Sequence, residues 1–277
     1  MAFAPRANRA ALGALRTRAF HAERLAPPAP PPALRFPRGW QGLVVHGGGE
    51  GAYKPTHPLV QLLSRHYCSE GVVSLELPAH GAHASPDLLS ADEARHAFRA
   101  ALLPHLCAFP TVAVGFSLGG KLLQSLWHEL PPSHPHRGVF IGSPPTARGS
   151  RLLAISAFWT PLAFRLRGAA PALRRLHGDE AWEATVHGVR AWCGAGSPVH
   201  AADEALAALR RDEAAARVHW VRARHDLPYP RAAFAELPPR AVSAVGCGHF
   251  NFFREGWAET AAAVEACLER ARPEADE

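Results

Sequence analysis

Short runs of apolar residues alternate with longer amphipathic stretches along most of the chain. The short runs predict strands near 41–46, 72–77, 111–116, 138–142, 218–223 and 240–245. The amphipathic stretches predict helices near 57–69, 91–107, 118–130, 230–236 and 256–271. Strands that alternate with helices are typical of stacked βαβ units. The pattern therefore predicts an α/β fold: a mostly parallel, open sheet of about six strands with helices on both faces.

One connection is far longer than the others. About 75 residues separate the predicted strands at 138–142 and 218–223, much more than such a connection needs. Helical patterns and large aromatic residues fill this stretch, among them Phe158, Trp159, Phe164, Trp182 and Trp192. A chain of 277 residues that is 48% hydrophobic can bury one large core. We therefore expect an insertion within a single domain that covers residues 39–272.

The first 38 residues differ in composition from the rest. Residues 1–22 contain four arginines and no acid, and Leu12, Leu15 and Ala19 fall near one helical face, as in organelle transit peptides. A disordered basic tail is the alternative. The proline-rich stretch 27–32 is expected to be extended and to form a linker that ends near Arg38. The expected location is intracellular, either an organelle (mitochondrion or plastid) or the cytoplasm.

The formal net charge of +6 is concentrated at this end of the chain. Of 30 basic and 24 acidic residues, seven arginines and Glu23 lie in residues 1–38, which leaves 23 of each sign in the remainder. A neutral domain without an aromatic and basic RNA motif lacks the charge of a phosphate-backbone binder, so no nucleic acid partner is expected. No run of about 18 apolar residues is present, so no transmembrane segment is expected either.

The cysteines and histidines are not spaced like metal ligands. The five cysteines are far apart and form no C-x-x-C pair, and the seventeen histidines form no H-E-x-x-H pattern. A reducing compartment is the default expectation for such cysteines. The sequence predicts no metal site.

A candidate nucleophile follows the predicted strand at 111–116. The segment Gly115-Phe116-Ser117-Leu118-Gly119 places a serine between a strand and a helix in a G-x-S-x-G turn. A serine on so sharp a turn adopts strained backbone angles, and its neighbours must be small while the hydroxyl projects beyond the sheet. A glycine-rich turn without chemistry is the alternative, but the flanking strand and helix favour Ser117 as a nucleophile.

A serine hydroxyl needs a base to take its proton and a carboxylate to orient that base. In chain order Ser, Asp, His, the partners are Asp226, after the strand near 218–223, and His249, after the last predicted strand. Both are expected in loops at the carboxyl ends of strands, where open α/β sheets form their sites. Individually, Asp226 is also a plausible cap of a turn and His249 a plausible buried loop histidine.

A tetrahedral intermediate also needs hydrogen-bond donors for its negatively charged oxygen. The segment His46-Gly47-Gly48-Gly49-Glu50-Gly51 follows the first strand of the body, and glycines let the backbone approach a ligand. We expect the backbone amides of Leu118 and of Gly48, or a neighbour of Gly48, to form this oxyanion hole. A phosphate-binding loop is the alternative, but no G-K-[ST] or G-x-G-x-x-G pattern follows.

Residues 40–272 resemble the α/β-hydrolase superfamily, in its serine-nucleophile branch with a helical cap. The segment 75–81 is similar to the family's "D-x-P-G-H-G" loop, although Glu76 and Ala79 replace the usual Asp and Gly. His80 in this loop is therefore expected to be structural. No β-hairpin is evident before residue 40, which leaves about six parallel strands.

The resemblance implies hydrolysis of an ester, thioester or amide through an acyl-enzyme, without metal or organic cofactor. It suggests an enzyme of the esterase, lipase or thioesterase kind (EC 3.1). Dehalogenases and epoxide hydrolases of this fold carry aspartate at the position of Ser117. The insertion, about 145–216, resembles the family's cap, and its Trp159 and Trp182 favour a small-molecule substrate with an apolar acyl or aromatic group.

Three other functions stay open at this point. Acyltransferases and lyases of this family use the same three side chains, so those residues do not separate them from hydrolases. A hydrolase-like binding protein without activity is the second alternative, although it has no need to keep Ser117, Asp226 and His249 together. An interaction protein anchored by residues 1–38 is the third. The sequence does not predict the oligomeric state.

Overall fold

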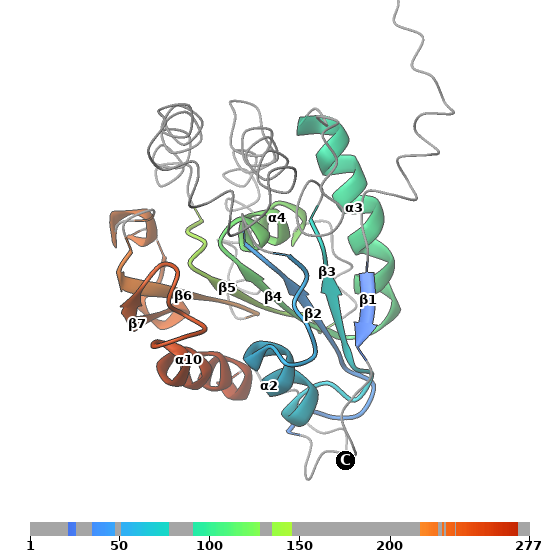
Figure 1. The fold of residues 1–277 in the computed structure, drawn as a ribbon, viewed down its shortest axis with the longest axis horizontal. Helices are drawn as coiled ribbons and strands as arrows, with labels where there is room; N and C mark the ends of the chain where they lie inside the picture. Colours follow the sequence, from blue (N-terminus) through green and yellow to red (C-terminus); the bar gives the residue numbers. More distant parts are fainter. Residues whose placement is uncertain are drawn as a thin grey trace, which may run out of the picture.

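The computed structural model describes residues 22–25, 35–47, 51–77, 91–127, 135–145, 217–226, 229, 231–235 and 237–270. These residues form a sheet with the strand order β1-β3-β2-β4-β5-β6-β7 (Figure 1). The strands are β1 (Ala22–Leu25), β2 (Gln41–Val45), β3 (Val72–Leu75), β4 (Thr111–Phe116), β5 (Arg137–Ile141), β6 (Val218–His225) and β7 (Val242–Gly248). The helices are α2 (Pro58–His66), α3 (Ala91–Ala108), α4 (Leu118–Leu126), α10 (Trp257–Arg270) and two short 3-10 helices, η3 (Arg231–Phe234) and η4 (Pro239–Ala241).

The predicted fold is confirmed in its central part. The six strands from β2 to β7 are parallel to one another and match the six apolar runs in the sequence. Side chains alternate between the two faces of a strand. In β2, Leu43 and Val45 belong to an apolar cluster that continues into α3 and α4, whereas Val44 belongs to one that continues into α2 and α10. Because helices cover both faces, a central strand such as β4 is buried along its whole length.

The structure adds a strand that the sequence did not predict. β1 pairs antiparallel with β3 at the edge of the sheet, with Ala22 opposite Leu75 and Leu25 opposite Val72. Phe36, also within residues 1–38, is buried and packs edge-on against the Trp40 and Tyr67 rings at 4.8 and 5.2 Å. Part of the segment interpreted as tail and linker therefore belongs to the folded body. A targeting role for its first residues stays a prediction.

The helix predicted near 230–236 is not an α-helix. The structure has only the 3-10 turn η3 there, four residues long. Proline lacks the backbone N–H that a helix needs and restricts the residue before it. Pro230 disfavours a helical conformation at Tyr229, and Pro238 disfavours one at Leu237, so only a short segment between them is left for a helix.

The direction in which the chain builds the sheet reverses between β2 and β4. From β2 the chain crosses to β3 on one side, and it then returns to β4 on the other side of β2. In open α/β sheets, ligands bind at such a switch point, outside the carboxyl ends of the strands. Gly47 follows β2 and Ser117 follows β4, so both lie at this edge.

The edge strand β1 provides the first test. A chain that begins at residue 35 loses β1 and exposes the unpaired edge of β3, whereas one that begins at residue 22 keeps both. Each lost backbone hydrogen bond contributes about 0.5–1.5 kcal/mol. We expect the shorter chain to melt about 4–8 °C lower than the longer one and to aggregate more readily. Equal melting temperatures in differential scanning fluorimetry would contradict the pairing of β1.

Candidate active site

Ser117 occupies a strained turn between β4 and α4. It has φ 48° and ψ −113°, and among the described residues it alone has a positive φ without being glycine. Such a backbone costs about 1–3 kcal/mol and persists only where the surroundings hold it. Its backbone N–H donates to the Ile141 carbonyl at 2.8 Å, which joins the turn to the end of β5. The strand and helix predicted on either side of Ser117 are both present.

The glycines on either side of Ser117 let α4 approach the sheet. A Cβ atom on Gly115 would lie 2.5 Å from the Cα of Gly120, and one on Gly119 would lie 2.5 Å from the Val45 carbonyl oxygen. Real Cβ atoms do not come so near to backbone atoms. The small residues of the G-x-S-x-G pattern are therefore a steric requirement of this turn.

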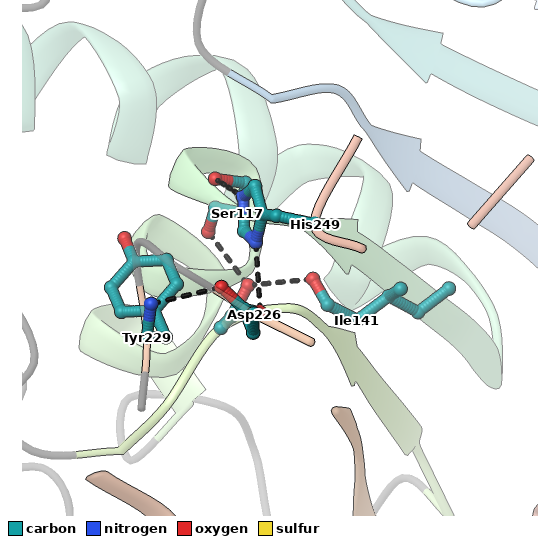
Figure 2. A network of polar contacts seen from close by, with 6 residues as sticks. Ser117, Ile141, Asp226, Tyr229 and His249 are labelled. Atoms are coloured by element: carbon teal, nitrogen blue, oxygen red, sulfur yellow. Dashed lines mark hydrogen bonds and ion pairs between the residues drawn. The ribbon is translucent and has the colours of Figure 1, made fainter. Parts of the chain in front are cut away.

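Ser117, His249 and Asp226 are joined by hydrogen bonds (Figure 2). The His249 Nε2 atom lies 2.9 Å from Ser117 Oγ, and the Nδ1 atom lies 2.9 Å from Asp226 Oδ2. Asp226 directly follows β6 and His249 directly follows β7, so three strand ends supply the three side chains. A carboxylate only accepts, which places the imidazole proton on Nδ1 and leaves Nε2 to accept from the serine hydroxyl.

The Asp226 carboxylate is held at both oxygens. Its Oδ1 atom accepts a hydrogen bond from the Tyr229 backbone N–H at 2.8 Å, while Oδ2 faces His249 (Figure 2). Asp226 and His249 are 9% and 4% exposed. A buried carboxylate is tolerated when it is paired and hydrogen-bonded. The short connection between β6 and η3 thus fixes the orientation of the carboxylate.

The imidazole of His249 is enclosed by aromatic rings and by a glycine. The Phe116 ring lies 5.4 Å away, close to parallel, and the Tyr229 ring lies at 5.3 Å. A Cβ on Gly142 would lie 3.0 Å from the imidazole Cε1, so the chain after β5 directly backs the ring. Phe250 meets the imidazole edge-on at 5.1 Å and is itself 74% exposed. These contacts restrict how far the imidazole can rotate.

The chain after β2 lies against Ser117. A Cβ on Gly47 would be 3.3 Å from the Cβ of Ser117. His46, fully buried, fixes this position because its Nε2 accepts from the Leu77 backbone N–H at 2.9 Å. Leu118 is the first residue of α4, and the first N–H groups of a helix have no partner within it. The Leu118 amide and Gly47 therefore flank the serine; Gly48 itself lies outside the described residues.

Burial also shifts the pKa of two other titratable side chains, Cys247 and His57. Burial and neighbouring carboxylates, first among them Glu259, raise the pKa of the Cys247 thiol. Burial lowers the pKa of His57 to about 4, so this imidazole, stacked on Tyr53 at 3.9 Å, is neutral at pH 7. Its Nδ1 accepts from the Leu59 N–H at the start of α2, which is a structural role.

Comparison of the sequence with family profiles gives a match over residues 43–263 to the alpha/beta hydrolase family. The chain belongs to the alpha/beta hydrolase family. The match runs from within β2 to beyond β7 and includes all three hydrogen-bonded side chains. A comparison with curated proteins finds no significant match.

Solved structures of the same fold support this membership. A Mycobacterium tuberculosis protein assigned as a non-heme bromoperoxidase, BpoC, superposes with a TM-score of 0.55 at 17% identity, covering 92% of this chain and 96% of that one. The type II thioesterase BorB from the borrelidin biosynthetic cluster gives 0.52 at 16% identity, covering 92% and 98%. At such identities the likeness shows the alpha/beta hydrolase fold and not the reaction.

Several predicted features of this alpha/beta hydrolase lie outside the described residues. They are Gly48, Ala79, His80, Trp159, Trp182 and, apart from residue 145, the insertion 145–216. Glu76, which replaces the family's Asp, is buried directly after β3. Over the described ranges, no group of three His, Cys, Asp or Glu side chains could hold a metal ion. No helix in the described part of the chain is long and apolar enough to cross a membrane.

Sequence reasoning missed three residues that support the site. They are Tyr229, which holds Asp226, and Gly142 and Ser143, which follow β5. Gly142 has φ +59°, and a glycine at the end of the strand predicted near 138–142 is the one signal that could have indicated this turn. The contacts of Tyr229 and Ser143 are made to residues whose positions only the folded sheet determines.

The close approach of α4 predicts a strong effect of one methyl group. Gly119→Ala should lower the free energy of unfolding by about 1–3 kcal/mol, because the new Cβ meets backbone atoms that cannot move freely. Gly248→Ala is the matched control, since its Cβ would meet nothing nearer than the His225 carbonyl at 3.8 Å. We expect the control to change stability by less than about 0.5 kcal/mol. Urea unfolding of both variants measures this, and equal midpoints would refute the steric account.

Proposed function

We propose that this protein is a serine hydrolase that cleaves a carboxylic ester or thioester through an acyl-enzyme on Ser117. The observation that supports this most strongly is the continuous series of hydrogen bonds from Asp226 through His249 to Ser117 Oγ, each 2.9 Å long. A base within hydrogen-bond reach of a hydroxyl, itself oriented by a third group, is the arrangement that makes a serine nucleophilic.

In the first half of the reaction, Ser117 Oγ forms a bond to the substrate's carbonyl carbon while its proton passes to His249 Nε2. The carbonyl π electrons move to the oxygen, and the negative charge is stabilised by the Leu118 amide and an amide at or near Gly48. The intermediate then collapses and expels the alcohol or thiol, which takes the proton from His249. Asp226 keeps the imidazole in the reactive tautomer and stabilises its positive charge.

In the second half, water replaces the alcohol or thiol. His249 takes a proton from water as the water oxygen attacks the acyl carbon, and the bond to Ser117 Oγ breaks. The proton returns to Ser117, the carboxylic acid leaves, and the free enzyme is restored. No step uses a metal or an organic cofactor.

We propose a substrate with an apolar acyl or aromatic group. Phe250 supports this, because among the described residues it is the one large apolar side chain that is exposed, and it directly follows His249. The interpretation of Trp159 and Trp182 as further contacts in the cap remains part of the proposal. The activities named for BpoC and BorB differ, so the shared fold does not select among reactions.

The proposed nucleophile can be tested without knowing the substrate. A fluorophosphonate should modify Ser117 alone, because only an activated hydroxyl attacks its phosphorus centre readily. Peptide mapping by mass spectrometry locates the adduct, and Ser117→Ala should remove it. An adduct that persists in Ser117→Ala would refute the assignment. A fully unreactive wild-type protein would favour the alternative of a binding protein without activity.

Asp226→Asn tests the role of the carboxylate. The amide oxygen can still accept from the Tyr229 N–H, so folding should be preserved, but the amide NH₂ faces His249 and favours the wrong tautomer. We expect kcat to fall on the order of 10³–10⁴-fold. The matched control is Glu259→Gln, the same change in an acid that accepts from the Gly246 N–H at 2.8 Å. Unchanged turnover in Asp226→Asn would mean that another acid orients His249.

A series of p-nitrophenyl esters of increasing acyl chain length, together with acyl-CoA thioesters, tests the proposed preference for an apolar acyl group. Phe250→Ala, Trp159→Ala and Trp182→Ala should each lower kcat/KM by roughly 10–200-fold for long acyl chains and much less for acetyl esters. A control in the core, Phe36→Ala, should lower stability by about 3–5 kcal/mol and keep the ranking of substrates. If the three site variants also lose stability and keep the ranking of substrates, the proposed contacts with an apolar acyl group are refuted.

A further inference from the structure

The chain that leaves β5 makes a turn directly behind Ser117. Gly142, with φ +59°, donates its backbone N–H to the Val221 carbonyl at 2.7 Å, so the turn is fastened to β6. The next residue, Ser143, is fully buried. Its hydroxyl is therefore not a surface group, and a buried hydroxyl has to be satisfied by a partner within the protein.

The partner of Ser143 is the backbone of the nucleophile. Ser143 Oγ donates to the carbonyl oxygen of Ser117 at 2.6 Å, and the Ile141 carbonyl lies at 3.1 Å from the same hydroxyl. The Ser117 carbonyl also accepts from the Lys121 N–H at 3.1 Å, as the first hydrogen bond of α4. Two donors therefore fix this carbonyl group: the Lys121 N–H within α4 and the Ser143 hydroxyl in the turn after β5.

The fixed carbonyl belongs to the same peptide unit as the Leu118 amide. A trans peptide is planar, so the C=O of Ser117 and the N–H of Leu118 point in opposite directions in one rigid plane. Holding the oxygen consequently sets the direction of the N–H. The Leu118 N–H is the donor that the proposed mechanism uses for the oxyanion, and an oxyanion donor acts through its preset orientation.

Ser143 is itself held in place from behind. The Gln124 side-chain amide donates to the Ser143 carbonyl at 3.0 Å, and the Trp220 indole N–H donates to the Gln124 amide oxygen at 3.3 Å. All three side chains are buried, so water does not compete for these bonds. The series connects α4, β5 and β6 to the peptide plane after the nucleophile.

We infer that Ser143 is a positioning residue that aims the Leu118 amide at the developing oxyanion. This rests on the proposed function, since it assigns Ser143 a task in that reaction. A purely structural hydroxyl would affect folding stability alone. A residue that aims an oxyanion donor affects the transition state, and so it changes kcat while KM stays the same.

The test compares two equivalent substitutions. Ser143→Ala removes the bond to the Ser117 carbonyl, and Ser125→Ala removes a buried bond of the same kind, from Ser125 Oγ to the Leu122 carbonyl at 2.7 Å, farther along α4. Removing an oxyanion donor costs about 10²–10³ in rate, so misaiming one should cost less, roughly 10–100-fold. The readout is the second-order rate constant of fluorophosphonate modification at Ser117, together with kcat and KM for the best p-nitrophenyl ester.

We expect Ser143→Ala to react roughly 10–100-fold more slowly than wild type, with lowered kcat and unchanged KM. The modification rate constant and kcat of Ser125→Ala should stay within about threefold of the wild-type values. The melting temperatures of both variants should fall by similar amounts, because each loses one buried hydrogen bond. If the wild-type protein reacts and the two variants have equal modification rates, the positioning role of Ser143 is overturned and the proposed function still stands. A wild-type protein that is not modified at Ser117 would overturn the proposed function and this inference with it.

Discussion

The packing of α4 against the ends of β2 and β4 is the constraint on which the site depends. It requires glycine at 115, where a side chain would meet the helix, and at 119, where one would meet the Val45 carbonyl. Under this constraint the chain can turn from strand to helix within one residue, and Ser117 takes up the strain with φ 48°. The hydroxyl consequently projects toward His249, and the first amide of α4 lies directly beside it.

The remaining parts of the site are fixed by the parallel sheet. Because β4, β6 and β7 run in the same direction, their carboxyl ends meet at one edge, and Ser117, Asp226 and His249 come together although 132 positions separate the first from the last. Burial of the acid and the base would be costly without partners. The Tyr229 N–H, which binds the second oxygen of Asp226, offsets part of that cost.

Much of this arrangement could be predicted from the sequence, because its signals are local. The apolar runs of β2, β3 and β4 are buried along their whole length, and the pattern around Ser117 reflects the steric limits of its own turn. β1 was missed because Ala22–Leu25 contains two charged residues in four and follows an arginine-rich segment. Its pairing depends on the free edge of β3. Ser143 was missed for a related reason, since its partner at Ser117 is 26 positions away and no spacing rule connects them.

Acyl transfer to Ser117 can be measured most directly with a carbamate, because carbamoyl groups on a serine are released slowly and therefore accumulate. The protein would be mixed with p-nitrophenyl N-butylcarbamate, and released p-nitrophenolate and the mass of each peptide would be followed together. The account predicts about one p-nitrophenolate per chain and a carbamoyl group on the peptide that contains Ser117. A carbamoyl group on another residue, or ester turnover without any acyl transfer to Ser117, would contradict it.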